Sequence, residues 1–362
     1  MKLALLGDIA LFGRCSSKSN SDIESYFGDV SELLGNYDLV VGNLETPFSR
    51  KKRTSGAKSA YICADDVDVR LLTLLNIDAL CLANNHMYDY GVEGVTLTKR
   101  LLELHKIDYF GLDGKDWRYQ DGTNRIAFTG CCCYSTNPLR TVPYGKEGVN
   151  EFNVARVSEI LSENSKDGFL NILSVHAGIE HVNYPSYDTI AAARKFADVA
   201  PYIYYGHHPH VAQAVESYKG SLIAYSLGNF CFDDVYSSVS GDEPLVKLTE
   251  NNRSSFILEI EIVENQIVSY NTIPIYIGKD KLHVGRGVQE DKLREYADAI
   301  NRMPRLEYEQ MRNTIIAGRA AERASKRDLK WVIKRLKPRY VELLITNFIN
   351  RRKYKACVSS KL

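Results

Sequence analysis

The sequence YIYYGHHPHV, residues 202–211, determines how the rest of the chain is interpreted. It begins with a short apolar, aromatic run of the kind that forms a buried strand. Three histidines then fall within four positions, at His207, His208 and His210, and Pro209 restricts the turn between the last two. Imidazoles placed there are either hydrogen-bonded structural groups or metal ligands. The surrounding sequence is needed to choose between these interpretations.

The composition is that of an ordinary globular protein with an uneven charge. The chain has 362 residues, of which 44% are hydrophobic and 25% charged, and its formal net charge is +1. Residues 319–362 nevertheless contain fourteen Lys and Arg against three Asp and Glu, so the remainder is acidic. We find no apolar run long enough for a membrane span, and the start lacks a signal-peptide pattern. Eight cysteines without a CxxC pair also suit a reducing compartment, so we expect a cytoplasmic protein.

Short apolar runs alternate with segments of helical spacing, which predicts an α/β fold with a central sheet. The expected strands are 2–8, 37–45, 77–86, 169–178, 202–210 and 220–230, and the expected helices are 67–76, 91–107, 151–164 and 188–199. Residues 254–277 alternate apolar and polar side chains, as a β-hairpin does. We expect one domain over residues 1–280 and a basic, mostly helical appendage over 281–362.

Five of the expected strands end in residues that can bind a metal ion. These residues are Asp8, Asn43, Glu45, Asn85, His86, His176, His208 and His210. Sites in open α/β sheets lie beyond the carboxyl ends of the strands, so the set favours a metal site over separate structural histidines. Carboxylate, amide and imidazole ligands without thiolate suit Mn, Fe or Zn, and also Mg. The number of ligands allows one or two divalent ions.

The order of these motifs resembles the calcineurin-like metallophosphoesterase superfamily and, within it, the CapA family associated with poly-γ-glutamate and capsule synthesis. The resemblance rests on LLGDIALFGR, VVGNLETPFS, LANNHMYDYGVEG, SVHAGIEHVNYP and GHHPHVAQAVESYKGSLIAYSLGNFCFD, which lie within about residues 1–235. It implies a four-layer sandwich of two mixed β-sheets flanked by helices, with the metal site at one edge.

The resemblance also implies roles for single residues. Asn85 looks like a metal ligand beside His86 as general acid, while His176, His208 and His210 look like further ligands, with His207 as a second choice. The superfamily's first motif has a histidine two positions after the aspartate, but this chain has Ala10 there, which weakens one metal position.

The bridging ligand between two metal ions stays open at this stage. A position match to the superfamily favours Asn43. A bridging ligand should be an anion, however, and that argument favours Glu45.

Three further residues are candidates for binding substrate. The Arg14 guanidinium can form a forked contact with a phosphate or carboxylate. Glu180 follows the His176 strand closely, and Asn229 belongs to the resembling SLGNF segment. Asp89 is interpreted as a turn residue that caps the following helix.

The basic C-terminal segment contains two apolar stripes separated by Pro338, which should break the helix. The stripes are Leu329, Val332, Ile333 and Leu336, then Val341, Leu344, Ile345 and Phe348. Residues 329–355 either contact the inner face of an anionic membrane or pack on the acidic body or a partner helix. No nucleic-acid-binding motif is visible, so we expect no nucleic-acid partner.

The sequence thus supports a CapA-like metal-dependent hydrolase with an anionic substrate or polymer, here a phosphoester. His86 would protonate the leaving oxygen and Arg14 would hold the charged group. Two alternatives stay open. One is a non-catalytic accessory component of a membrane-bound polymer synthase within a capsule synthesis complex. The other is a metal-dependent hydrolase of γ-glutamyl amide bonds.

Overall fold

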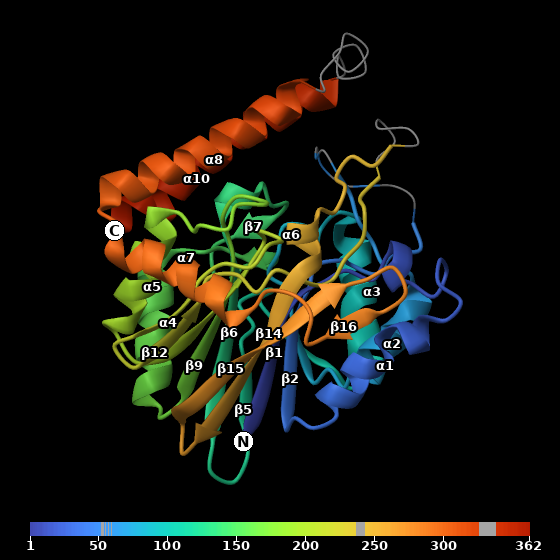
Figure 1. Cartoon of the computed structure of the whole chain (residues 1–362), viewed down its shortest axis with the longest axis horizontal. Coiled ribbons are helices and arrows are strands. Elements are labelled where there is room, and N and C mark those ends of the chain that lie inside the picture. Colours follow the sequence, from blue (N-terminus) through green and yellow to red (C-terminus); the bar gives the residue numbers. More distant parts are fainter. Residues whose placement is uncertain (52–53, 55, 57, 59, 237–242, 326–337) are drawn as a thin grey trace.

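Two mixed β-sheets pack against each other and are flanked by helices (Figure 1). The computed structural model describes residues 1–362 except 52–53, 55, 57, 59, 237–242 and 326–337. The Tyr205 hydroxyl, which lies in the second sheet, donates a hydrogen bond to the Leu6 carbonyl of the first. The predicted fold class, two mixed sheets flanked by helices, is confirmed.

The first sheet has the strand order β16-β15-β14-β1-β2-β3-β4, and β13 also pairs with β1. Its strands are β1 (Lys2–Ile9), β2 (Leu39–Leu44), β3 (Ala79–Cys81), β4 (Asp108–Phe110), β13 (Asn229–Cys231), β14 (Ser254–Val263), β15 (Gln266–Ile277) and β16 (Leu282–Val284). Strands β1 to β4 are parallel, so their carboxyl ends lie at one edge. The predicted hairpin at 254–277 is the antiparallel pair β14 and β15.

The second sheet has the order β11-β12-β10-β9-β6-β5. Its strands are β5 (Trp117–Gln120), β6 (Arg125–Cys132), β9 (Leu170–His176), β10 (Tyr202–His207), β11 (Val215–Tyr218) and β12 (Ser221–Ala224). Strands β6, β9, β10 and β12 are parallel. A short separate pair, β7 (Thr141–Val142) and β8 (Val149–Asn150), lies outside both sheets.

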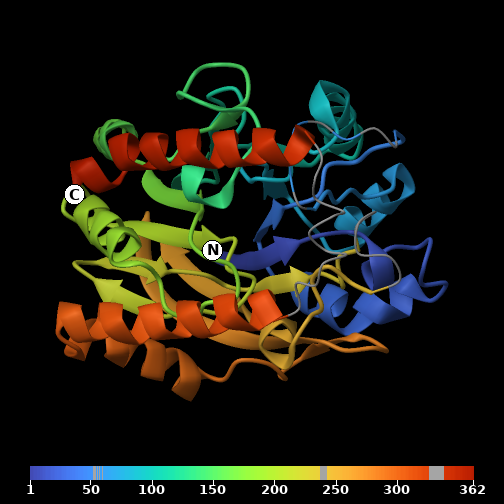
Figure 2. The same ribbon diagram turned by 90° about the horizontal axis from the view of Figure 1, so that it is seen from above.

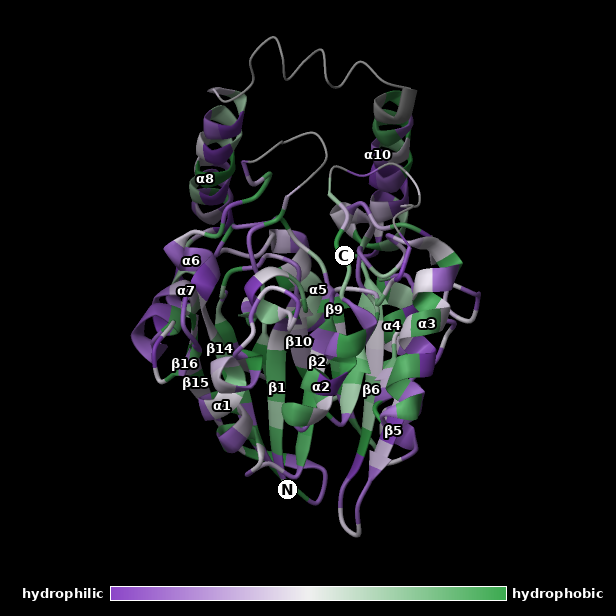
Figure 3. Ribbon diagram, turned by 90° about the vertical axis from the view of Figure 1, so that its right-hand side faces the viewer, coloured by the Kyte–Doolittle hydropathy of each residue, from purple (hydrophilic) through white to green (hydrophobic). Residues whose placement is uncertain are grey.

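Helices cover the outer faces of the two sheets (Figure 1). Beside the first sheet lie α1 (Ile23–Leu34), α2 (Val69–Leu74) and α3 (Gly91–Leu104), and beside the second lie α4 (Val154–Lys166) and α5 (Tyr187–Ala197). Short helical turns occur at η1 (Gly13–Cys15), η2 (Asp66–Asp68), η3 (Tyr134–Thr136), η4 (Ser359–Lys361) and α6 (Glu250–Arg253). Hydrophobic residues concentrate in the strands (Figure 3), because both sheets are buried between layers.

Two of the expected strands differ from those found. The strand expected over 77–86 is limited to β3, because the following residues form a turn. The strand expected over 220–230 is divided between β12 in the second sheet and β13 in the first. Gly228, with φ 80°, precedes β13 and permits the chain to change sheets in a conformation that other residues disfavour. Helix α1 and strands β4 to β6 were not predicted.

The C-terminal part consists of α7 (Glu290–Arg302), α8 (Arg305–Ser325) and α10 (Pro338–Cys357). Figure 2 shows α8 and α10 on opposite sides of the molecule. Pro338 begins α10, whereas all four residues of the first apolar stripe lie outside the described residues, so its predicted role as a helix breaker stays a prediction. No helix in the described part of the chain is long and apolar enough to cross a membrane.

The second apolar stripe does not pack on the body. Val341, Leu344, Ile345 and Phe348 are 57–69% exposed. Helix α10 instead packs through its other face, where Asn350 and Cys357 are buried. The prediction that this stripe packs on the catalytic body is therefore wrong for these four residues.

Candidate metal centre

The predicted ligands come together because parallel strands of both sheets end at the same place. Asp8 lies near the end of β1, Glu45 follows β2, and Asn85 lies in the turn after β3. From the second sheet, His176 ends β9, while His208 and His210 follow β10. All six side chains are buried.

Glu45 occupies the middle of this cluster. Its side chain is 0% exposed, and neither carboxylate oxygen has a hydrogen-bond partner among the described residues. Oε1 lies 3.7 Å from His176 Nε2 and 3.6 Å from His210 Nε2. Burial, and then the nearby Asp8 carboxylate, raise the Glu45 pKa well above its usual value. A buried carboxylate without partners is costly unless a cation compensates it.

The histidines around Glu45 offer unprotonated ring nitrogens. The His176 Nε2 lies 2.8 Å from Asn85 Oδ1 and 3.2 Å from His208 Nδ1, while His176 Nδ1 has no hydrogen-bond partner in the described structure. Burial lowers the His208 pKa to about 3 and the His176 pKa well below its usual value. Neutral imidazoles are the form that binds metal. Ligand atoms of Glu45, His208 and His210 all lie within 4.8 Å of one another.

The backbone directs the histidines inward at some conformational cost. His208 has φ 94° and His210 φ 55°, values that residues other than glycine rarely adopt. Just before them, a Cβ on Gly206 would lie 1.9 Å from the Tyr225 carbonyl oxygen, so only glycine fits. Such strain concentrates at functional sites.

Asp8 is held by several neighbours. Its Oδ1 accepts a hydrogen bond from the Asn43 amide at 2.8 Å and lies 2.9 Å from His207 Nδ1, and its Oδ2 lies 3.4 Å from His210 Nδ1. Burial, the largest single influence, would raise the Asp8 pKa, but His207, His210 and Asn43 together outweigh it, so the pKa is lowered.

The donor set fits a divalent cation. Two carboxylates, an amide oxygen and several neutral imidazoles surround a point where buried polar atoms lack partners. Asn43 already uses its amide on Asp8, and its Oδ1 accepts a hydrogen bond from Asn84 at 3.3 Å. Glu45 makes no such bonds with the described residues, so its oxygens are available to a cation. This geometry therefore favours Glu45 over Asn43 as the expected bridging ligand.

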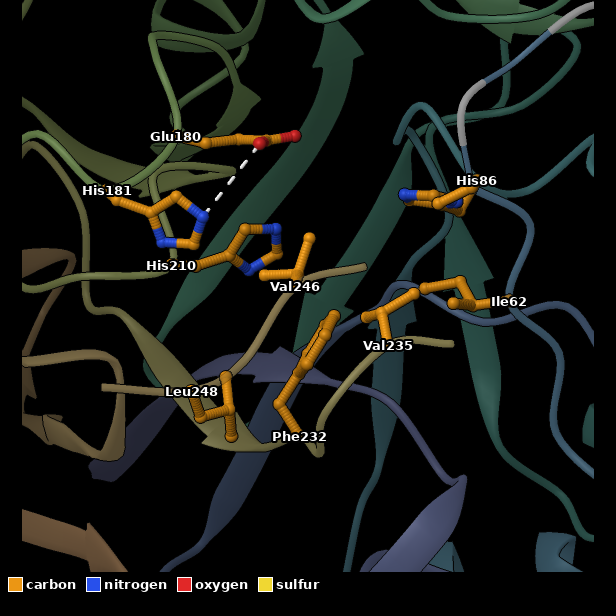
Figure 4. Close-up of a pocket in the computed structure, with 10 residues that line it drawn as sticks. Ile62, His86, Glu180, His181, His210, Phe232, Val235, Val246 and Leu248 are labelled. Carbon is orange, nitrogen blue, oxygen red and sulfur yellow. Dashed lines mark ion pairs between the residues drawn. The ribbon is translucent and has the colours of Figure 1, made fainter. Parts of the chain in front are cut away.

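His86 lies on the other side of a pocket from His210, Glu180 and His181 (Figure 4). Its Nδ1 lies 2.6 Å from Asp89 Oδ2 and 3.0 Å from the buried Lys58 amine, which also pairs with Asp89 at 2.6 Å. The interpretation of Asp89 as a helix cap is therefore corrected, since its carboxylate holds His86. The sequence analysis also missed Lys58 and His181. In the sequence, the signal for the contact between His86 and Asp89 was that the two residues lie three positions apart.

The pocket has a volume of about 430 Å³, part of it open to solvent. Besides its polar groups it has a wall of apolar side chains, namely Ala60, Ile62, Phe232, Val235, Val246 and Leu248.

The three predicted substrate-binding residues have different surroundings. Arg14 Nη2 and Nε lie 2.6 and 2.7 Å from the same oxygen, Asp233 Oδ1. Arg14 does not line the pocket. Asn229 lies behind His210, because its Oδ1 is 2.9 Å from His210 Nδ1. Glu180 lines the pocket, with Oε2 3.9 Å from His181 Nε2.

The family model for the bacterial capsule synthesis protein PGA_cap matches residues 2–234. The chain belongs to this family. It is 29% identical over 304 residues to the capsule biosynthesis protein CapA of Bacillus anthracis, covering 80% of this chain and 73% of the relative. It is 29% identical over 279 residues to the PGA biosynthesis protein CapA of Bacillus subtilis, covering 73% and 72%.

Among solved structures, the NAD nucleotidase of Haemophilus influenzae is similar with a TM-score of 0.44 and 13% identity. That comparison covers 87% of this chain and 60% of the nucleotidase.

Proposed function

We propose that this chain is a metal-dependent hydrolase of an anionic ester, with a phosphoester as the expected substrate, and that it acts in capsule or poly-γ-glutamate synthesis. The observation that supports this most strongly is Glu45, whose buried carboxylate has no hydrogen-bond partner in the described part of the chain and faces His176 and His210. The family membership supports the association with capsule synthesis.

One or two divalent ions, with Mn, Fe, Zn or Mg as candidates, would be held by Asp8, Glu45, Asn85, His176, His208 and His210. When bound, such an ion supplies Lewis-acid polarisation of a phosphoryl or carbonyl oxygen. His207 Nε2, which is buried and has no hydrogen-bond partner among the described residues, is a reserve ligand where the superfamily's first-motif histidine is missing.

His86 is the proposed proton donor to the leaving oxygen. It lines the pocket, and Asp89 holds its Nδ1, which leaves Nε2 for the substrate. Asp89 favours the protonated ring, whereas burial and Lys58 oppose it and lower the His86 pKa overall. A lowered pKa makes the protonated ring a stronger acid but leaves less of it protonated, so proton donation by His86 should increase as the pH falls. Asn229 would act by orienting His210.

The predicted substrate contact of Arg14 stays a prediction. Its guanidinium would have to exchange Asp233 for a substrate anion. Glu180 lines the pocket, but its carboxylate would repel an anionic substrate, so its predicted substrate contact also stays a prediction.

The test is metal analysis followed by an activity assay. We expect the purified protein to contain close to one or two divalent ions per chain, and His208→Ala/His210→Ala to lose most of them. His86→Ala should keep its metal but lose hydrolysis of p-nitrophenyl phosphate by about 100-fold or more. If the wild-type protein holds no metal after dialysis against Mn or Zn, the hydrolase proposal is wrong.

A second candidate function, an accessory role at a membrane, is favoured by the exposed stripe of α10. Val341, Leu344, Ile345 and Phe348 have the spacing of one helix face, and Arg351, Arg352, Lys353 and Lys355 follow them. An apolar face with adjacent cations suits the inner face of an anionic bilayer.

Vesicle sedimentation tests this candidate. Leu344→Asp/Phe348→Asp should abolish binding to anionic vesicles. Val268→Asp/Tyr270→Asp, which changes exposed apolar residues of β15, is the matched control and should bind as the wild type does. Equal binding by both double variants would contradict the membrane role of α10.

Hydrolysis of γ-glutamyl amide bonds uses the same proposed ligands. It would appear as metal-dependent cleavage of poly-γ-glutamate by a preparation that leaves p-nitrophenyl phosphate intact. The apolar pocket wall does not distinguish the two substrates.

A further inference from the structure

Helix α8 lies outside the part of the chain that the family model matches, yet it packs along the loop that forms one wall of the pocket. The Tyr308 hydroxyl donates to the Pro185 carbonyl at 2.8 Å, and Arg312 Nε donates to the Tyr184 carbonyl at 3.0 Å. The helix therefore runs antiparallel to this loop, towards the residues that line the pocket.

Two arginines near the C-terminal end of α8 reach the rim of the pocket. Arg319 Nη1 donates to the His181 carbonyl at 2.6 Å, and Arg323 Nη2 lies 3.8 Å from Glu180 Oε2. Both His181 and Glu180 line the pocket (Figure 4). Because Arg312, Arg319 and Arg323 follow helical spacing, they lie on one face of α8.

The two guanidinium groups at this rim repel each other and lie near two carboxylates, Glu322 and Glu180. Burial and then the neighbouring Arg323 lower the Arg319 pKa, and they outweigh Glu322 and Glu180, which act in the opposite direction. The contact of Arg323 with Glu180 is long, and their side chains are 57% and 41% exposed, so it is a weak ion pair. An incoming anion can replace it at little cost.

We propose that Arg319 and Arg323 form an anion subsite at the rim of the pocket, where they bind a second anionic group of the substrate. The first group would lie at the candidate metal centre, so this inference rests on the proposed function. The ligands it selects carry at least two anionic groups, either carboxylates or phosphates. Guanidinium groups suit both, because their N–H groups match paired oxygens.

The test compares ligands that differ in the number of anionic groups. Dissociation constants are measured by calorimetry on the full metal-loaded chain for fructose 1,6-bisphosphate against fructose 6-phosphate, and for pentaglutamate against glutamine, which has a single carboxylate. We expect Arg323→Gln to weaken the multiply charged member of at least one pair about tenfold, as loss of one charge-assisted contact does. The member with only one anionic group should change less than about twofold.

Three further variants complete the design. Arg323→Lys should retain part of the affinity, and Glu180→Gln, which removes the competing carboxylate, should tighten binding of the multiply charged ligand. Arg302→Gln removes a more exposed charge on α7, 78% exposed against 57% for Arg323, where Arg302 pairs with Asp298, and it should have no effect.

The outcomes separate the subsite from the hydrolase proposal. A response in the phosphate pair assigns the subsite to phosphorylated ligands, and a response in the glutamate pair assigns it to polycarboxylates. Arg323-dependent binding supports the subsite even if no ester is hydrolysed. If Arg323→Gln leaves both pairs unchanged, or weakens both members of each pair equally, the subsite is refuted even in a metal-containing, active protein.

Discussion

Replacing Glu45 by glutamine should stabilise the metal-free protein while abolishing its metal binding. The wild-type carboxylate is fully buried and has no hydrogen-bond partner among the residues that the structure describes, and the Asp8 carboxylate is nearby. Glutamine has nearly the same shape without the ionisable group. A side chain that destabilises the metal-free protein but is required for metal binding is characteristic of a metal ligand.

The magnitude follows from the raised pKa of Glu45. Above the unfolded-state pKa of about 4.3, the unfolded chain releases this proton while the folded protein keeps it. The free energy of unfolding therefore falls as the pH rises, by about 1.4 kcal/mol per pH unit, until the folded-state pKa is reached. The stabilising effect of Glu45→Gln should grow with pH at the same rate. The buried histidines with lowered pKa values are present in both proteins, so their contributions cancel in the difference.

Urea unfolding in EDTA, at about pH 5.5, 6.5 and 7.5, measures this difference. Glu24→Gln is the control, because Glu24 is 67% exposed and pairs with Arg70 at the surface. Its free energy of unfolding should change with pH as that of the wild type does. Excess Mn²⁺ should raise the melting temperature of the wild type but not that of Glu45→Gln. If the metal-free wild type and Glu45→Gln keep a constant stability difference across this pH range, the reasoning about the buried carboxylate is wrong.

Three further predictions concern the support of the site and the fold. Asp89→Asn should lower kcat about 100-fold or more with metal content unchanged, because His86 loses the carboxylate that contacts its Nδ1. An unchanged kcat at full metal occupancy would argue against a catalytic role for the contact between His86 and Asp89. Asn229→Ala should weaken metal affinity about 10- to 100-fold in a chelator competition, because His210 loses its Nδ1 partner. Gly206→Ala should lower the free energy of unfolding by about 3 kcal/mol or more, since its Cβ would meet the Tyr225 carbonyl, and a stable, well-folded variant would show the packing there to be looser.

Much of the fold could be predicted because it depends on local sequence patterns. The apolar runs at β1, β2, β9 and β10 mark buried parallel strands, and the alternation in β14 and β15 marks a hairpin. The less regular elements were missed or merged. The 220–230 segment reads as one apolar run, but its two halves pair with different sheets, a choice made by contacts with distant residues.

The candidate site, like the fold, was only partly predictable from the sequence. Polar residues at strand ends were visible in the sequence, and parallel pairing brings them to one edge. The partners of other side chains were not visible. Arg14 pairs with Asp233, more than 200 residues away, and Lys58 reaches His86 and Asp89 from a separate loop.

The sequence by itself determined the main buried strands and the hairpin, the family resemblance and the residue types at the strand ends, because these depend on short-range periodicity and motif spacing. Only the tertiary structure decided that Glu45 is buried without partners, that α10 exposes its apolar stripe, and that α8 brings Arg319 and Arg323 to the pocket. Burial and charge pairing depend on which distant segments meet, and the separation of residues along the chain does not specify those contacts.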